Sequence, residues 1–513
     1  MQKNERKVLK MKKALLLLMA ALLLFTAACS GGLSVQTTTT KATAKNQAWK
    51  DLIKEEEVED EAPVFDVESI APVTAQLIGE DYPTDNAFYP EYDDDLNLRD
   101  PLGVYVEELG RYYMMTGNFL LYAEEDEMNL QPLCTKEGCE HNLAASLADK
   151  RACEAWFHTD DQRVVLHYNC MDGRLYLAHY SDSYILTLTS ILSDGSDRRE
   201  EFVHEGQENT GGAFNNMIFH RGRFYYTFSE WKGNKSYINQ LWSYALNTPD
   251  AEPELLYTAQ NLTDSPWGFE TSAYGRYLYI TEDLGGSGQG GNNLVYGNAG
   301  LILDLTSGEW LSQTRMHNVP EEFVFSDSFV RDGKLVSRYE NKMTYHVQQE
   351  ITQSNQGNND KLEDVQQQRL CVESELDGLD PVILEECEER NYNVSDDNYV
   401  CDFLYEAESA NQVALNVCDH AGNVVREVIY GEFFPEAFNS TEPRPEGDIV
   451  YYASWLVSGE KLILRTEYHV AGVDIFATLE NADYVYYVIE YADIENQNVP
   501  IREVFRYNEQ DYT

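Results

Sequence analysis

The chain has 513 residues, with 38 Lys and Arg against 88 Asp and Glu, and a formal net charge of −50 at pH 7. A surface of this sign repels phosphate backbones and anionic lipid headgroups, which argues against nucleic acid as a partner and against direct electrostatic attachment to a membrane. Hydrophobic residues make up 43% and aromatic residues 12% of the chain, enough for a large core, so its composition is not that of a disordered protein.

The N-terminus has the organisation of a bacterial export signal. Six Lys and Arg residues lie within the first 13 positions, and residues 14–25 form an uncharged apolar run of twelve. A bilayer-spanning helix needs about 20 apolar residues, so this shorter run fits a signal peptide. Small residues precede Cys29, as in a lipobox, where a signal peptidase cuts before a cysteine that carries diacylglycerol. We predict a lipoprotein signal peptide over residues 1–28 and lipid attachment at Cys29; the alternative is an ordinary cleaved signal.

Residues 29–100 are predicted to form a flexible acidic tether. Residues 30–45 are small and polar, as in a spacer from a membrane, and residues 46–61 are rich in acids. The following stretch, up to about residue 95, reads as irregular chain. We therefore expect order to begin near Leu102, in a protein held at the cell membrane by its lipid alone and facing outside the cytoplasm.

Residues 101–513 carry a recurrent pattern in which a turn residue, often Gly, precedes a run rich in Tyr, Phe, Leu and Ile. The pattern returns every 49 to 66 residues. Short strands that repeat at such a period predict an all-β fold, a β-propeller of about seven four-stranded blades. Six or eight blades, or stacked β-sandwiches, are the alternatives. The markers are Gly117, Gly173, Gly222, Gly275, Gly333, Tyr399 and Gly459.

Two polar insertions are expected to project from the blades as loops. Gly285–Asn293 is rich in glycine, but no Lys followed by Ser or Thr comes after it and no helical pattern begins there, so it is not a phosphate-binding loop. Val347–Arg369 is rich in Gln and is expected to form a long hairpin or loop of the fifth blade.

The export signal, the polar tether and the segment "PLCTKEGCEH" with a third cysteine at Cys153 precede the glycine-led strands. Together they resemble the uncharacterised TolB-like β-propeller lipoproteins of Gram-positive gut bacteria. The resemblance covers roughly residues 100–513. It implies a propeller fold and a cell-envelope location, and it supplies no activity.

Cys134, Cys139 and Cys153 lie within twenty residues of one another, and His141 follows the second of them by two positions. Three Cys and one His would complete the tetrahedral shell of a structural zinc site. Outside the cytoplasm, the even number of cysteines that remains after lipidation of Cys29 favours disulfides instead. Both interpretations stay open: one structural zinc, or a disulfide within the triplet. The role is structural in either case, and no other cofactor is expected.

No catalytic residues are evident. The pair His204-Glu205 is not followed by the second His of an H-E-x-x-H zinc motif, and no G-x-S-x-G nucleophile elbow occurs. Propellers often recognise partners through loops, so we predict a surface-anchored, monomeric binding module for a protein, peptide or glycan. The alternative is an extracellular glycan- or phosphoester-degrading enzyme with a calcium-supported acidic channel. A phosphate-directed enzyme would need several Lys or Arg residues converging at one mouth of the channel.

Overall fold

The structure, a computed structural model of the whole chain, describes residues 65–508 with gaps. The longest gaps are residues 140–150, 285–297, 342–368, 430–448 and 470–482. The chain divides into two units, Met1–Ala62 and Pro63–Thr513, and the described residues belong to the second. No helix in this described part is long and apolar enough to cross a bilayer.

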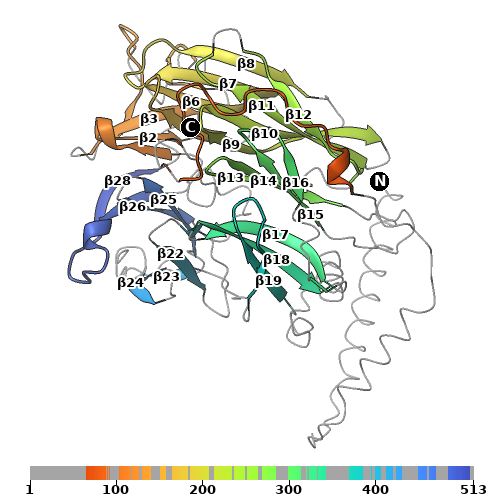
Figure 1. Cartoon of the computed structure of the whole chain (residues 1–513). Coiled ribbons are helices and arrows are strands. Elements are labelled where there is room, and N and C mark those ends of the chain that lie inside the picture. Colours follow the sequence, from red (N-terminus) through yellow and green to blue (C-terminus); the bar gives the residue numbers. More distant parts are fainter. Residues whose placement is uncertain are drawn as a thin grey trace, which may run out of the picture. The chain divides into compact units, whose positions relative to one another are not determined.

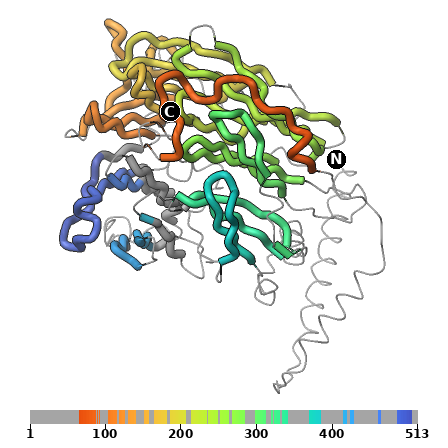
Figure 2. The backbone as a smooth tube through the Cα atoms, viewed as in Figure 1, coloured from red at the N-terminus to blue at the C-terminus, as the bar shows by residue number. Residues whose placement is uncertain are grey.

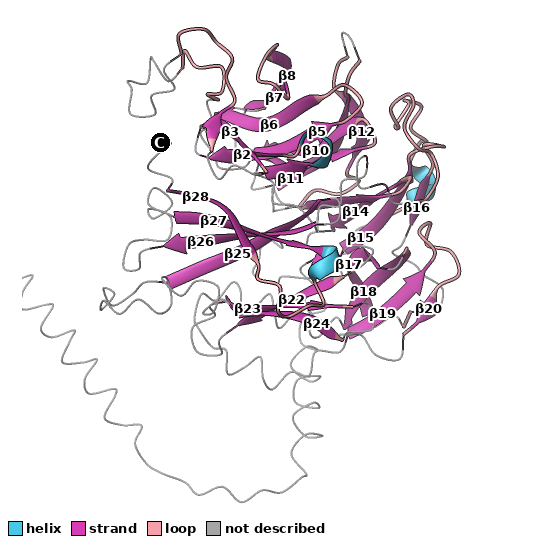
Figure 3. Ribbon diagram, turned by 90° about the vertical axis from the view of Figure 1, so that its left-hand side faces the viewer, coloured by secondary structure: helices cyan, strands magenta, loops and turns pink. Residues whose placement is uncertain are grey.

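The described residues form seven sheets of four antiparallel strands each (Figure 1). Each sheet takes four consecutive strands in chain order, which is how the blades of a β-propeller are built. The prediction of an all-β propeller of about seven blades is therefore confirmed. Strands dominate the regular structure (Figure 3). The described helices are the 3-10 turns η2 (Val67–Ser69), η4 (Glu107–Leu109) and η7 (Tyr491–Asp493).

The strands follow the blades in sequence. Blade one contains β1 (Gly103–Val106), β2 (Arg111–Thr116), β3 (Phe119–Glu124) and β4 (Gln131–Pro132). Blade two contains β5 (Val164–Asn169), β6 (Arg174–Asp182), β7 (Ile185–Leu192) and β8 (Arg199–Glu205). Blade three contains β9 (Ala213–His220), β10 (Arg223–Gly233), β11 (Ser236–Ala245) and β12 (Glu254–Thr258). Blade four contains β13 (Phe269–Tyr274), β14 (Tyr277–Asp283), β15 (Asn298–Asp304) and β16 (Trp310–Ser312).

The last three blades repeat this order. Blade five contains β17 (Phe323–Arg331), β18 (Lys334–Asn341), β19 (Arg369–Ser374) and β20 (Val382–Ile383). Blade six contains β21 (Val394–Ser395), β22 (Val400–Tyr405), β23 (Gln412–Cys418) and β24 (Val424–Ile429). Blade seven contains β25 (Ile449–Ser458), β26 (Lys461–His469), β27 (Asp483–Glu490) and β28 (Arg502–Asn508).

Buried apolar clusters lie between neighbouring blades. They join blade one to two, two to three, three to four, four to five and six to seven. A further cluster joins blade seven to blade one, and it contains Leu121 of β3 and Ile463 of β26, both almost inaccessible to solvent. Burial of each such side chain contributes about 1.5–3 kcal/mol. Because no strand is exchanged between the first and last blades, their side chains close the ring.

The turn between the first and second strands has a common design in blades one to five. Its glycine takes a left-handed backbone that other residues rarely adopt, for example with φ 60° at Gly110 and 67° at Gly173. In these blades and in blade seven, a cation at or directly before the start of the second strand pairs with a carboxylate of its own blade. The pairs are Arg111–Glu124 (2.7 Å), Arg174–Asp197 (3.0 Å), Arg223–Glu254 (2.7 Å), Arg276–Asp304 (3.3 Å), Lys334–Glu375 and Lys461–Glu490 (3.7 Å).

Gly117, the sequence marker for blade one, is not equivalent to the other marker glycines. β2 ends at Thr116 and β3 begins at Phe119, so Gly117 falls between the second and third strands. Gly110 occupies the equivalent position. The sequence is ambiguous here because "GRYYMM" and "GNFLLY" both place an apolar strand after a glycine.

Residues 65–87, which the sequence analysis assigned to the flexible tether, instead pack on the propeller (Figure 2, red). Leu77 and Ile78 are buried in the cluster between blades three and four. The Tyr225 hydroxyl of β10 donates to the Leu77 carbonyl at 2.6 Å. This stretch, which we call the N-terminal strap, is thus part of the folded body, while residues 29–64 lie outside the described residues.

Arg221 hydrogen-bonds to the backbone of the N-terminal strap. Arg221, in the first turn of blade three, is fully buried. Its guanidinium donates to the carbonyls of Pro83 (2.9 Å), Asp85 (2.8 Å) and Ala87 (2.7 Å). The strap also meets the first turn of blade four, where a Cβ added to Gly275 would lie 3.0 Å from the Asn86 carbonyl oxygen. It therefore lies at the end of the propeller that carries the first turns.

Candidate metal centre

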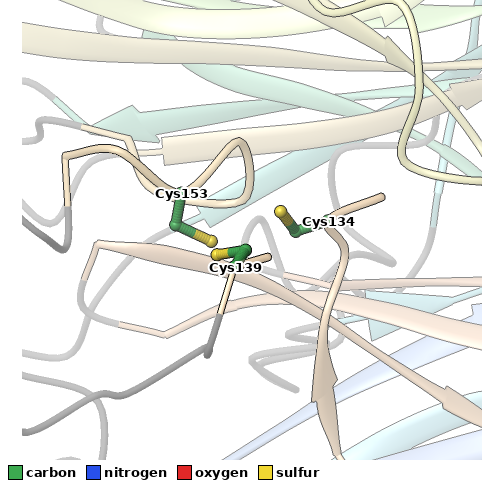
Figure 4. Close-up of side chains that lie close together, drawn as sticks. All are labelled: Cys134, Cys139 and Cys153. Carbon is green, nitrogen blue, oxygen red and sulfur yellow. The ribbon is translucent and has the colours of Figure 1, made fainter. Parts of the chain in front are cut away.

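Three of the four residues predicted to form a metal site or a disulfide converge in the structure. The sulfur atoms of Cys134, Cys139 and Cys153 all lie within 4.8 Å of one another, and the side chains are directed toward one another (Figure 4). None of the three is linked by a disulfide. Cys153 is buried, and the other two are half-buried. The fourth predicted ligand, His141, lies outside the described residues, as does the predicted lipid-attachment residue Cys29.

The cluster forms where the chain leaves and rejoins the outer edge of blade one. The amide of Leu133 donates to the Leu120 carbonyl at 2.9 Å, which continues the pairing of β4 with β3. Beyond the excursion the chain returns to the same edge, because the Leu120 amide donates to the Ala155 carbonyl (2.9 Å) and the Phe157 amide to that of Asn118 (2.7 Å). Cys134 and Cys153 therefore stand at the two ends of one loop.

Blade two supports this loop from the side. A Cβ at Gly195 would lie 3.1 Å from the Leu133 carbonyl carbon and 3.3 Å from the Cys134 nitrogen, so the turn fits closely only with glycine. Arg198 donates to the carbonyls of Glu154 (2.9 Å) and Trp156 (2.6 Å), on either side of Ala155. Its guanidinium also lies 3.9 Å from the centre of the Phe157 ring. The site is therefore built from both blades.

The cluster places its thiols in different electrostatic environments. Burial works to raise the pKa of Cys134, but amide hydrogen bonds from Lys136 and Glu154 and hydrogen bonds with the two other cysteines outweigh it, so this pKa is lowered. Burial raises the pKa of Cys153. Burial also lowers the pKa of the nearby Arg198 guanidinium.

The arrangement suits two kinds of chemistry. Zinc binds thiolates at about 2.3 Å, so sulfurs around one ion stand roughly 3.8 Å apart, which the cluster can reach with small side-chain rotations. A disulfide needs about 2.05 Å between two sulfurs and would leave the third cysteine outside the bond. Cys371 does take part in a disulfide elsewhere in the chain. Among the described residues, the three cysteines are the one group of His, Cys, Asp or Glu close enough to hold a metal ion.

Gly195 and Arg198 could not be predicted as part of this site because they lie in the next blade, more than forty residues from the cysteines they support. In the sequence, "SDGSDRR" at residues 193–199 has the composition of a hairpin turn and carries no mark of a contact with the cysteines. The cations that begin the second strands could have been found, because Gly-Arg or Gly-Lys pairs stand at residues 110, 173, 222, 275 and 333.

Comparison with known proteins finds no matching family model and no matching curated protein. Solved structures do match. The β-propeller domain of the trilobed protease from Pyrococcus furiosus is 11% identical, with a TM-score of 0.31 over 64% of this chain and 93% of that one. Sqt1 from Saccharomyces cerevisiae is 10% identical, with a TM-score of 0.34 over 80% and 99%. Such values carry no argument about function, and the seven blades are established by the sheets themselves.

Proposed function

We propose that this chain is a lipid-anchored protein of the cell envelope whose propeller binds a protein, peptide or glycan at one of its two ends. The export signal and Cys29 support the anchor. The observation that carries the binding role is the difference between the ends. In an antiparallel blade, the first-to-second and third-to-fourth connections lie at one end and the second-to-third connection lies at the other.

The end with the first turns is compact. Its glycine turns are tight, its strand-starting cations are paired with carboxylates, and the N-terminal strap lies across the turns of blades three and four. Val73, for example, donates its amide to the Gly308 carbonyl at 2.8 Å, in the third-to-fourth turn of blade four. The turns at this end are therefore already in contact with other parts of the same chain.

The opposite end carries the long second-to-third connections. These connections join Asp283 to Asn298 in blade four, Asn341 to Arg369 in blade five and His469 to Asp483 in blade seven. Residues 285–297, 342–368 and 470–482 within them lie outside the described residues, and so do most of the two predicted insertions. Binding residues in proteins gather on loops held by a rigid scaffold. We assign the ligand surface to these connections, with the blades as the scaffold.

The phosphoester-degrading alternative needs several Lys or Arg residues free to meet phosphate. Six described cations do gather at one end, at or directly before the first residue of the second strand of each blade. Each of them pairs with a carboxylate of the same blade, so they are engaged in holding the blades together. We therefore favour binding over phosphoester hydrolysis.

The test is a binding screen of the purified protein against neutral and anionic polysaccharides and basic peptides. In a variant, residues 285–296 are replaced by an Asn-Gly turn. The expected result is a bound probe that the variant loses, with an unchanged melting temperature. Glu107→Ala, an exposed change at the compact end, is the control and should bind normally. Retained binding in the loop variant with loss in the control would reverse the assignment, and no binding by any probe would contradict the role.

A further inference from the structure

We infer that Cys134, Cys139 and Cys153 together bind one zinc ion, which fastens the outer edge of blade one. Three sulfurs drawn from two separate segments lie within 4.8 Å of one another. A disulfide would account for the convergence of two of them. A metal ion accounts for all three, because thiolates share a single cation.

The surroundings of the cluster match those of a thiolate site. Backbone amides of Lys136 and Glu154 hydrogen-bond to the Cys134 sulfur, one from each end of the loop. Such bonds orient a metal ligand and stabilise its negative charge. The turn between Cys134 and Cys139 is closed by a hydrogen bond from the Cys139 amide to the Lys136 carbonyl at 3.1 Å, and Gly138 in that turn has φ 77°.

Arg198 is a positioning residue for this site. Zinc with three thiolates carries one negative charge, since Zn²⁺ and three thiols give the complex and three released protons. The Arg198 guanidinium approaches from blade two and fixes the carbonyls of Glu154 and Trp156, directly after Cys153. It thus supplies a compensating positive charge and holds the segment that carries the most buried ligand.

The position of the site defines its role. The chain stops pairing with β3 after Leu133 and pairs with it again at Ala155. An ion bound to Cys134 and Cys153 joins the two ends of this excursion and removes the entropy that the open loop would have in the unfolded chain. Zinc suits this role because it is redox-inert and accepts thiolates.

The experiment uses the full chain, purified anaerobically without chelator. Elemental analysis should give about one zinc per chain, and a strong chelator should remove it and lower the melting temperature, which added zinc but not magnesium restores. Cobalt substitution should produce sulfur-to-cobalt charge-transfer absorption. Cys139→Ser should abolish zinc binding, whereas Cys170→Ser, at a thiol outside the cluster, should leave it intact.

A second measurement is the rate at which Arg198→Ala releases zinc. It should release zinc to a competing chelator at least tenfold faster than the original chain, and Arg198→Lys should recover part of the difference. A protein without zinc whose mass shows a disulfide within residues 134–153 overturns the inference, as does zinc retained at full stoichiometry in Cys139→Ser. The chelation experiment on the unaltered chain decides the question even where a variant fails to fold.

Discussion

The Lys461 ammonium donates a hydrogen bond to the Tyr105 hydroxyl at 2.8 Å and so joins positions 356 residues apart in the chain. The same ammonium pairs with Glu125, and it lies 4.3 Å from the centre of the Tyr105 ring. Lys461 begins the second strand of blade seven, and Tyr105 lies in the first strand of blade one. The equivalent cation of blade three, Arg223, also donates to the Gln76 carbonyl of the N-terminal strap, whereas Lys461 of blade seven also holds blade one.

Replacing Lys461 by Met should therefore weaken the closure of the ring. The side chain is 12% exposed, and the change leaves Glu125 and Tyr105 without their cationic partner. We expect the free energy of unfolding to fall by about 1–2 kcal/mol, measured by chemical denaturation. Lys232→Met removes a more exposed pair within blade three and serves as the control, with an effect below about 0.5 kcal/mol. Equal losses of unfolding free energy in the two variants would contradict the role of Lys461 in closing the ring.

Arg221→Ala should release the N-terminal strap. Three backbone carbonyls lose a buried charged donor, and each such hydrogen bond contributes about 1.5–3 kcal/mol. We expect a loss of several kcal/mol in the free energy of unfolding and new proteolytic cleavage between residues 65 and 92. In the original chain, limited proteolysis should stop before residue 65. Arg199→Ala, at a side chain that is 57% exposed, should leave the cleavage pattern unchanged. A strap that stays protected in Arg221→Ala would contradict this anchoring role.

Glu282 should make stability depend on pH. It is fully buried between blades three and four, where burial raises its pKa to about 7 despite a 2.8 Å hydrogen bond from the Tyr257 hydroxyl. The folded state therefore keeps a proton that the unfolded state loses above its ordinary pKa of 4.5. Stability should fall as pH rises from about 4.5 to 7, by about 3 kcal/mol from this group, and then level off.

Glu282→Gln isolates that contribution. Its stability relative to the original chain should improve across the same pH window, as followed by denaturant unfolding at several pH values. Glu309→Gln, at an exposed position, should show no such trend. A difference between Glu282→Gln and the original chain that is constant with pH would show that Glu282 does not titrate there.

Cys29→Ser tests the lipid anchor. Without the thiol no diacylglycerol can be attached, so the protein should leave the membrane fraction for the medium or remain unprocessed. Fractionation and mass measurement of the mature N-terminus check the result, with Cys170→Ser as the matched cysteine change. Continued membrane association of processed Cys29→Ser protein would refute the anchor.

His141→Ala tests whether the predicted histidine completes the shell of the proposed zinc site. Loss of a direct ligand should weaken zinc binding by about a hundredfold or more, measured by chelator competition. It should also shift the absorption of the cobalt-substituted protein. Asn142→Ala, at the adjacent position, controls for disturbance of the segment. An unchanged zinc affinity would assign the fourth position to another group.

The propeller could be predicted from the sequence because each blade repeats a local pattern, a glycine turn followed by an apolar strand. The N-terminal strap could not. Its partner Arg221 binds the carbonyls of residues 83, 85 and 87, and every residue has a carbonyl, so no side-chain pattern marks these contacts. The cysteine cluster was recognisable because thiols are rare and closely spaced. The contact of Arg198 with the segment after Cys153 could not be recognised in the sequence, since it exists only when two blades meet.

The assembly of each blade from four consecutive strands has a kinetic consequence. The chain can complete one blade after another from local contacts, which form quickly. The contact between blades one and seven is different, because it must wait for the last strands. Until then Leu121 and the other residues of blade one that will face blade seven have no neighbour to cover them. The interval between the folding of blade one and the closure of the ring is therefore the period in which this protein is most exposed to aggregation.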